Sequence, residues 1–151
     1  MHLYRICSSR YATDLSGSGA ALYGGRWNKK GQFVLYCGES KEIALLETIV
    51  HVPPQIAPDL SLITLEIPDQ SCLEMGIEQL PANWRNYPAP IVLAELGAEW
   101  YRDGQYLALK VPSCIIDTAW NYILNCSHPD FTQVQIISTE LFPYDQRLQR
   151  K

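Results

Sequence analysis

Three residue types that suit nucleotide chemistry lie close together in this chain. Gly24 and Gly25 come directly before Arg26, and Tyr36 and Glu47 follow within the next 21 residues of the sequence. Glycine lets the backbone approach a ligand closely because it has no Cβ, and the planar guanidinium of arginine suits phosphate oxygens. The stretch therefore offers an anion contact, an aromatic ring and a carboxylate, which a nucleotide-handling enzyme needs.

Glu47 lies among aliphatic residues of a helix predicted over residues 41–51. Ile43, Leu46 and Val50 share its face at the three- and four-residue spacing of a helix. A carboxylate in an apolar stripe is costly unless something pairs with it. Such a glutamate is either held by a structural partner or kept for a function, for example to stabilise a developing positive charge.

Arg26 and Tyr36 each allow two interpretations. Arg26 is either a solvated turn residue or a contact for a phosphate or pyrophosphate. The chain lacks the Gly-Lys-Ser/Thr of a Walker loop, and the glycine pair does not open a helix after a strand, so neither common phosphate motif is present. Tyr36 is either a core residue or an aromatic surface beside Glu47, on which a base could stack or a ribose could hydrogen-bond.

Ser113 and Arg5 are weaker candidates. Ser113 follows Pro112 at the end of a predicted strand without a Gly-x-Ser-x-Gly motif, so it suits a ligand contact or a turn cap better than a hydrolase nucleophile. Arg5, on the first predicted strand, is either a second anion contact or an exposed residue. Cysteine and histidine spacings do not predict a metal site.

Hydrophobic periodicity and turn residues predict the elements that carry these side chains. The pattern predicts strands over residues 3–7, 32–37, 59–67, 106–111 and 134–138, and helices over residues 41–51 and 91–102. Residues 8–25 are predicted to form a long ordered loop, residues 71–90 an irregular segment with a short helical turn near residue 77, and residues 120–125 a short element. Strands and helices do not alternate regularly, which favours an α+β fold over a doubly wound sheet.

Length and composition predict one domain over residues 1–151, with one hydrophobic core. The net charge of −4 gives no support to direct nucleic-acid binding, which usually shows as a basic stripe. Five cysteines, an odd number without zinc or redox spacing, predict free thiols and a cytoplasmic location. No apolar run approaches the ~20 residues that a membrane-spanning helix needs.

The order and spacing of these motifs resemble those of the RES-domain family, toxins of bacterial toxin–antitoxin pairs. The resemblance covers most of the chain and rests on Tyr4-Arg5-Ile6, Gly25-Arg26-Trp27-Asn28, Val34-Leu35-Tyr36, Ala44-Leu45-Leu46-Glu47, Val111-Pro112-Ser113 and His128-Pro129-Asp130-Phe131. The family is named for an arginine, a glutamate and a serine, which would here be Arg26, Glu47 and Ser113, with Tyr36 as the pocket tyrosine. The chain departs from the pattern at Cys126, where many relatives carry proline.

The resemblance implies both a fold and an activity. The expected fold is α+β, with a split, bent β-sheet like that of the ADP-ribosyltransferase toxins and helices packed around an NAD cleft. Such relatives consume NAD as a substrate, not as a permanently bound cofactor, by splitting the nicotinamide–ribose bond with water or phosphate, and some modify a protein. The implied partner is an Xre-type helix-turn-helix antitoxin that blocks the cleft. The oligomeric state, a homodimer included, stays open.

We therefore predict an NAD-cleaving enzyme that needs no metal. Glu47 is expected to stabilise the cationic transition state and to contact a ribose hydroxyl. Arg26 is expected to hold the pyrophosphate, Tyr36 to orient the nicotinamide riboside, and Ser113 to fix the geometry on the nicotinamide side. The other predicted NAD-binding residues are Trp27, Asn28 and Arg5.

Three other interpretations compete with this prediction. The chain could be an ADP-ribosyltransferase with a protein acceptor, or a nucleotide-binding module without catalytic activity. It could also be a small α+β domain in which Glu47 forms an ion pair with Arg26 for stability alone.

Overall fold

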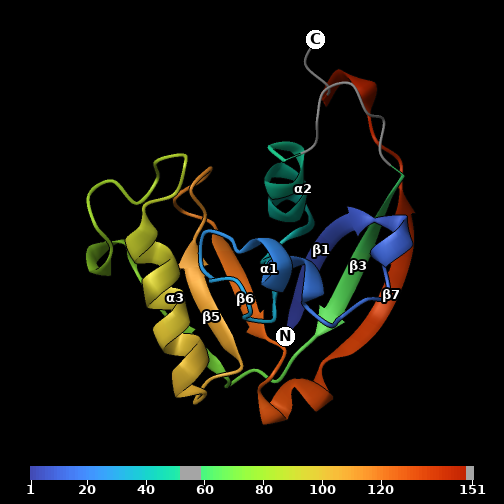
Figure 1. Ribbon diagram of the computed structural model, residues 1–151. Coiled ribbons are helices and arrows are strands. Elements are labelled where there is room, and N and C mark those ends of the chain that lie inside the picture. Colours follow the sequence, from blue (N-terminus) through green and yellow to red (C-terminus); the bar gives the residue numbers. More distant parts are fainter. Residues whose placement is uncertain (52–58, 149–151) are drawn as a thin grey trace.

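The computed structural model describes residues 1–51 and 59–148, which form a seven-stranded sheet with three α-helices (Figure 1). The strands are β1 (His2–Ser8), β2 (Val34–Gly38), β3 (Leu60–Glu66), β4 (Cys72–Glu74), β5 (Ala108–Pro112), β6 (Trp120–Asn125) and β7 (Gln135–Phe142). The α-helices are α1 (Ser18–Tyr23), α2 (Lys41–Ile49) and α3 (Ile91–Asp103), and short 3₁₀ helices cover Ser9–Tyr11, Ile77–Gln79, Pro129–Gln133 and Gln146–Leu148. The predicted α+β class is confirmed.

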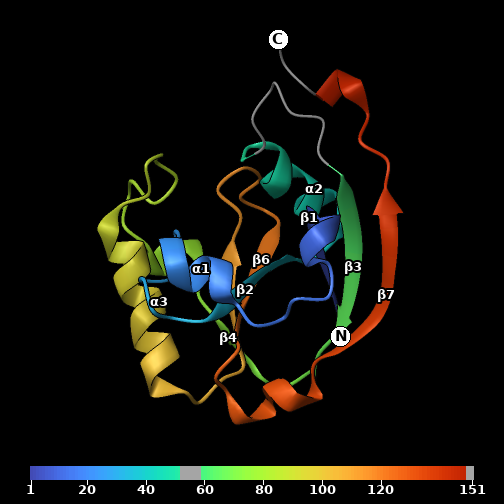
Figure 2. The same ribbon diagram turned by 45° about the vertical axis from the view of Figure 1, so that its right-hand side comes forward.

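The sheet is divided into two groups of strands that join at one point. Its order is β4-β5-β6-β2-β1-β3-β7, and only β4 and β5 run parallel. β1 pairs with β3 at seven positions and β2 pairs with β6 at five, but β1 and β2 pair only at Tyr4 and Gly38. Figure 2 shows β3 and β7 on one side of the molecule and β6 and α3 on the other. Because β1 and β2 diverge away from this pair, the sheet leaves room between its two groups of strands.

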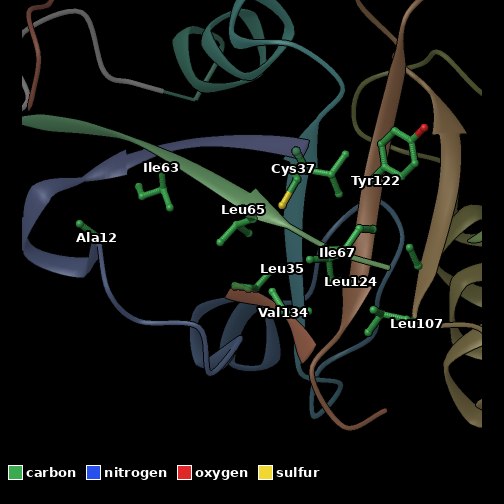
Figure 3. Packing of buried hydrophobic residues seen from close by; sticks show 12 residues of the cluster. Ala12, Leu35, Cys37, Ile63, Leu65, Ile67, Leu107, Tyr122, Leu124 and Val134 are labelled. Atoms are coloured by element: carbon green, nitrogen blue, oxygen red, sulfur yellow. The ribbon is translucent and has the colours of Figure 1, made fainter. Parts of the chain in front are cut away.

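Side chains from both groups of strands share one hydrophobic core (Figure 3). It includes Leu3, Leu35, Cys37, Ile63, Leu65, Ile67, Leu107, Tyr122, Leu124 and Val134. Successive side chains of a strand point to opposite faces, so Leu35 and Cys37 enter this core while Val34 and Tyr36 lie on the other face of β2. There Val34 packs in a second cluster with Trp100 of α3, and Tyr36 lies at its margin. The two faces of β2 therefore pack in different clusters, and Tyr36 lies on the face directed toward α3.

α2 begins where its sequence predicts. The Ser40 side chain accepts a hydrogen bond from the Ile43 amide at 3.2 Å, which caps the first turn. The first turn of the helix packs closely against β2. A Cβ on Gly38 would lie only 2.8 Å from the Ala44 nitrogen, so the position requires glycine. The chain continues to Pro53 and Pro54, which cannot extend a helix and would end this one, and both lie outside the described residues.

The structure differs from the prediction in two segments. Residues 8–25 were predicted as a loop, but they contain α1, whose Ala21 and Ala20 carbonyls accept hydrogen bonds from Gly31 N and the Asn28 side chain. The predicted irregular segment 71–90 contains β4, a three-residue edge strand paired with β5. Both elements are short and bond to residues outside themselves, which sequence periodicity does not report. The helical turn near residue 77 and helix α3 are confirmed.

Candidate active site

A cleft of about 1080 Å³ opens where β1 and β2 diverge. Its size is close to the upper end of the ~300–1,000 Å³ that small-molecule sites usually have. It is lined by both strands, by α1 and α2, by residues 85–89 and by the turn after β5. Predicted site residues that line it are Arg5, Arg26, Trp27, Tyr36 and Glu47, whereas Ser113 and Asn28 are buried next to it.

The Glu47 carboxylate is held through one of its two oxygens. Its Oε1 accepts a hydrogen bond from Ser113 Oγ at 2.8 Å and another from Asn121 Nδ2 at 2.7 Å. Ser113 follows β5 and Asn121 lies in β6, opposite Val111 of β5, so the two donors come from adjacent strands. Within the described residues Oε2 has no hydrogen-bond partner. The carboxylate is therefore oriented by neutral donors, and one oxygen is left for a ligand.

The face of α2 that carries Glu47 is a wall of the cleft rather than a buried stripe. Ile43 is buried as predicted, but Val50 is 60% exposed. The residues of α2 and its C-terminal end that line the cleft are Ala44, Glu47, Thr48, Val50 and His51. Among the described residues Glu47 forms no ion pair, so the predicted alternative of a structural Glu47–Arg26 pair is wrong. The ion pairs found lie elsewhere.

Tyr36 supports the segment that carries Arg26. Its hydroxyl donates to Asn28 Oδ1 at 2.7 Å and accepts from the Trp27 amide at 3.1 Å. Burial raises the pKa of the Tyr36 phenol well above its usual range, so it remains a protonated donor. Gly25 passes close to this ring, because a Cβ there would lie 2.7 Å from the hydroxyl oxygen. Glycine is therefore required at position 25 because a larger residue would collide with Tyr36, and the sequence did not predict this role.

Asn28 and Trp27 are packed into the protein on this wall. Asn28 Nδ2 donates to the Ala20 carbonyl at 2.9 Å and to the Lys29 carbonyl at 3.1 Å, so both ends of this amide have protein partners. Trp27 is almost fully buried, and any side chain at Gly97 of α3 would overlap its carbonyl oxygen. The structure therefore gives Asn28 a supporting position behind the cleft, and it anchors Trp27 against α3.

The two predicted anion contacts have different surroundings. Arg26 donates from Nη1 to the Trp84 carbonyl at 2.8 Å and from Nη2 to the Asn86 carbonyl at 3.1 Å. Arg5 donates from Nη1 to the Asp14 carbonyl at 3.2 Å. Neither arginine forms an ion pair with a described residue, so each brings a positive charge to the cleft. Asp14 also lines the cleft near Arg5, and hydrogen bonds from Ser16 lower the pKa of the Asp14 carboxyl, which the Arg5 charge helps to lower further. By strand alternation Arg5 lies on the face of β1 opposite Tyr4 and Ile6, which pack toward α2.

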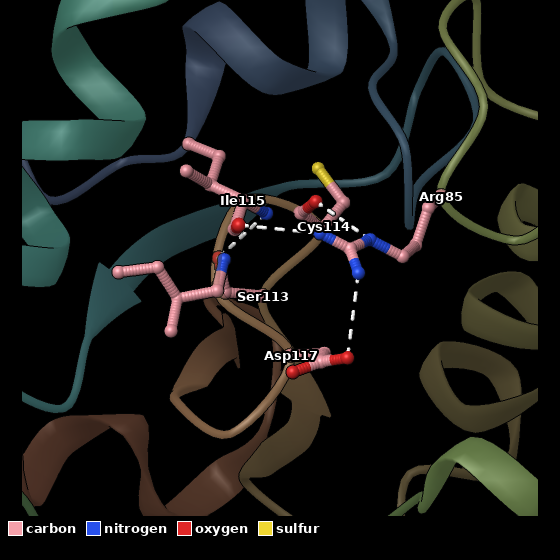
Figure 4. Close-up of polar contacts among 6 residues, drawn as sticks. Arg85, Ser113, Cys114, Ile115 and Asp117 are labelled. Atoms are coloured by element: carbon pink, nitrogen blue, oxygen red, sulfur yellow. Dashed lines mark hydrogen bonds and ion pairs between the residues drawn. The ribbon is translucent and has the colours of Figure 1, made fainter.

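Two further polar residues of this site were not predicted from the sequence. Asn121 reaches Glu47, and its signal in the sequence was a polar residue within the apolar run of residues 120–125. Arg85 lines the cleft and donates to the Cys114 and Ile115 carbonyls and to Asp117 (Figure 4). Arg85 lies in a segment without periodicity, so no pattern distinguished it from a surface arginine.

The charges of Arg26 and Glu47 both act on the Cys114 thiol. Burial raises the pKa of this thiol, the Arg26 charge lowers it, and the Glu47 charge raises it further. Arg26 and Glu47 themselves form no hydrogen bond or ion pair with one another. Across residues 1–51 and 59–148, no group of three or more histidine, cysteine or acidic side chains could hold a metal ion. In the same ranges no helix has the length and apolar character needed to cross a bilayer.

Comparison with known proteins identifies the family of this chain. The Toxin Res of Yersinia enterocolitica is 38% identical over 151 residues, which cover 98% of this chain and 99% of that protein. The Prs ADP-ribosylating toxin of Sphingobium sp. is 34% identical over 144 residues, 93% of this chain and 89% of that protein.

Among solved structures, a chain of the M. tuberculosis MbcT–MbcA toxin–antitoxin complex matches with a TM-score of 0.79. The match covers 94% of this chain and 84% of the M. tuberculosis chain. At 18% sequence identity it shows a shared fold alone. A family model described as RES domain matches residues 2–145. The chain therefore belongs to the RES domain family.

Proposed function

We propose that this protein is the toxin of a toxin–antitoxin pair and that it depletes NAD by cleaving the nicotinamide–ribose bond. The observation that carries the proposal is the arrangement of Glu47, whose Oε1 is held by Ser113 and Asn121 while Oε2 has no partner among the described residues. The carboxylate lines a cleft large enough for a dinucleotide. The relatives named Toxin Res support the biological class.

A preoriented carboxylate suits the chemistry of this bond. As the bond between C1′ and nicotinamide breaks, both electrons go to the ring nitrogen, which loses its positive charge, and positive charge develops on the ribose. The free oxygen of Glu47 would stabilise that charge and hydrogen-bond a ribose hydroxyl, without reorganising during the reaction. The acceptor oxygen then forms a bond to C1′ and releases its proton, where it carries one, to solvent.

The remaining cleft residues would bind and orient NAD. We propose that the positive charges of Arg26 and Arg5 attract the pyrophosphate and that the wall formed by Tyr36 and Trp27 faces the nicotinamide riboside. Ser113 would act through Glu47 rather than on nicotinamide directly, because its hydroxyl is fully buried and donates to the carboxylate. Asn28 would act through Tyr36. NAD is the substrate in this scheme, and no resident cofactor is needed.

The divided sheet supports the proposal of an ADP-ribosyltransferase-like fold with NAD bound between β1 and β2. A partner would then regulate access to the cleft. The solved chain of similar fold belongs to a toxin–antitoxin complex, so we propose an antitoxin, of the Xre helix-turn-helix type, that covers the cleft mouth. A cytoplasmic site of action fits both this substrate and the free cysteines.

A second candidate is transfer of ADP-ribose to a protein. It uses the same bond cleavage, with a side chain of the target as acceptor, and the name of the Sphingobium relative, Prs ADP-ribosylating toxin, favours it. A nucleotide-binding module without catalysis would bind NAD and release no nicotinamide.

The proposal is tested by measuring nicotinamide release from NAD by the purified protein, with and without inorganic phosphate. Glu47→Gln should slow release by about 10²–10³-fold, because it removes the charge while keeping the shape. Glu42→Gln is the matched control, since Glu42 is exposed in the first turn of the same helix. Dependence on phosphate would identify phosphorolysis, and independence would identify hydrolysis.

Other outcomes would choose among the alternatives. Label from adenine-labelled NAD that stays on a protein would favour the transferase. Saturable NAD binding without nicotinamide release, with or without cell extract, would favour the binding module. Equal rates for wild type and a folded Glu47→Gln would remove Glu47 from the mechanism.

A further inference from the structure

Arg85 lines the cleft and makes three side-chain hydrogen bonds, and the predicted mechanism does not use it. Its Nε donates to the Cys114 carbonyl at 3.1 Å, its Nη2 to the Ile115 carbonyl at 3.3 Å, and its Nη1 to Asp117 Oδ2 at 3.3 Å (Figure 4). Each of the three guanidinium nitrogens therefore donates one hydrogen bond to the turn after β5 or to Asp117. Arg85 is consequently placed to hold this turn.

The turn that Arg85 holds is the one that orients Ser113. The Ile115 amide donates to Ser113 Oγ at 3.1 Å and the Ile116 amide does so at 3.3 Å. The same hydroxyl donates to Glu47 Oε1. Arg85 holds the carbonyl side of residues 114–115 while their neighbouring amides hold Ser113, so a shift of this turn would move the serine and with it the carboxylate.

Arg26 fixes the backbone on both sides of Arg85. It donates to the carbonyls of Trp84 and Asn86, the two residues that flank Arg85. The Trp84 side chain is buried in the cluster beneath α3, which fixes this segment further, and its ring lies 5.9 Å from the Arg85 guanidinium carbon. The direction in which Arg85 leaves the backbone is therefore set by Arg26.

We propose that Arg26 and Arg85 act in series as positioning residues for Glu47. The series runs from Arg26 to the backbone around Arg85, from Arg85 to the turn 114–116, and from that turn through Ser113 to the carboxylate. Arg26 thus has a role besides attracting the pyrophosphate by its charge, and Arg85 becomes a residue on which catalysis depends without contact to the substrate. This inference rests on the proposed NAD cleavage.

Lysine substitutions separate position from charge. Lysine keeps the positive charge but is a point donor without the planar fork of arginine, so it cannot make the same set of hydrogen bonds. Arg85→Lys and Arg26→Lys should each lower kcat for nicotinamide release by about tenfold and leave KM within about twofold, since small misplacements of a reacting group are costly. If Arg26 served NAD binding alone, Arg26→Lys would leave kcat unchanged.

The double variant tests whether the two residues act in series. Residues of one network give non-additive effects, whereas independent residues give effects that multiply. Arg26→Lys with Arg85→Lys should therefore have a kcat within about twofold of the slower single variant. A loss close to the product of the two single losses, or an increase in KM alone, would overturn the proposal. Arg147→Lys is the matched control, because Arg147 also bonds through its guanidinium, to Asp145, on the exposed surface.

Amide hydrogen exchange tests the structural part without any turnover. Exchange of the Ile115 and Ile116 amides should accelerate at least severalfold in Arg85→Lys and Arg26→Lys and remain unchanged in Arg147→Lys. Unchanged exchange in both arginine variants would refute the series even if NAD cleavage is confirmed. Accelerated exchange in a protein that releases no nicotinamide would show that the series exists and that the proposed reaction is wrong.

Discussion

The Glu47 side and the Arg5 side of the cleft are built from different kinds of contact. On the Glu47 side, the carboxylate on α2 accepts hydrogen bonds from Ser113, at the end of β5, and from Asn121, in β6. These two donors lie 66 and 74 residues from Glu47 in the sequence. On the Arg5 side, Arg5 reaches a carbonyl nine residues away, and Asp14 accepts a hydrogen bond from Ser16 two residues away. Distant segments supply the side-chain contacts on the Glu47 side, whereas the side chains of Arg5 and Asp14 bond to residues near them in the sequence.

The two sides of the cleft therefore suit different tasks, catalysis on the Glu47 side and ligand binding on the Arg5 side. Catalysis needs groups that are fixed before the substrate arrives, and the Glu47 side has them. Binding of a flexible, charged ligand tolerates more movement, because the attraction between charges depends weakly on their geometry. The contrast predicts that substitutions on the Glu47 side act mainly on kcat and those on the Arg5 side mainly on KM.

The largest effect beyond Glu47 itself is expected at Ser113 and Asn121. Ser113→Ala removes a donor to Glu47 and leaves the Ile115 and Ile116 amides without their acceptor, and Asn121→Ala removes the other donor. Each should lower kcat by about 10–100-fold, because the carboxylate loses its fixed orientation. Steady-state kinetics with NAD would measure this. A rise in KM without a fall in kcat would contradict the assignment of these residues to Glu47.

A stability effect is expected at Tyr36. Tyr36→Phe leaves the buried Asn28 Oδ1 and Trp27 amide without their partner, so the free energy of unfolding should fall by about 1–3 kcal/mol. Chemical denaturation would measure the loss. The control is Tyr23→Phe, since Tyr23 is exposed on α1 and has no hydrogen-bond partner among the described residues. Equal stability of both variants would show that the hydroxyl network does not support this wall.

A smaller effect is expected on the Arg5 side. Arg5→Gln removes a positive charge and should raise KM for NAD by about threefold without changing kcat, and the difference should shrink at high salt, which screens exposed charges. Kinetics at two ionic strengths would test this. An unchanged KM would confine NAD to the Glu47 side and remove Arg5 from the binding site.

The smallest expected effect is protection of cleft cysteines from alkylation by bound NAD, which would show which sides of the cleft NAD covers. Cys7 lines the Arg5 side and Cys114 the Glu47 side, and burial raises the pKa of both thiols. In Glu47→Gln, which keeps NAD intact, saturating NAD should slow alkylation of both cysteines at pH 8 by about two- to fivefold. Cys72 is the control, because burial raises its pKa too while it does not line the cleft. Protection of Cys114 alone would place NAD on one side.

The sequence predicted much of the fold and part of the site. The helices over residues 41–51 and 91–102 were found because each carries a long periodic pattern with clear start and stop signals, and most strands were found by their apolar residues. α1 and β4 were missed, since six helical residues that include a glycine and a three-residue edge strand carry almost no periodic signal. Glu47 was singled out for its position on α2, but its true surroundings were not predicted.

The candidate residues show the same limit. Arg26 and Tyr36 were identified by type and order, yet the carbonyls that Arg26 holds are 58 and 60 residues away in sequence. Asn121 and Arg85 were missed, because their importance depends entirely on what lies across the fold from them. Asn28 was predicted as a ligand contact, and Ser113 as a ligand contact or a turn cap. The turn cap is confirmed, because Ser113 Oγ accepts hydrogen bonds from the Ile115 and Ile116 amides. The placement of both residues behind the cleft wall follows from hydrogen bonds to Tyr36 and Glu47 that no local pattern contains.

Propensity, periodicity and motif order are local properties of the chain, and they were enough to predict the elements with strong patterns, the family and the residue types available for chemistry. The single pair at which β1 and β2 meet, and the hydrogen bonds that hold Glu47 to Ser113 and Asn121 in place of Arg26, depend on the packing of the whole molecule. A buried hydrogen bond needs a particular distance and direction between its atoms, and segments far apart in the sequence reach that geometry only in the folded chain.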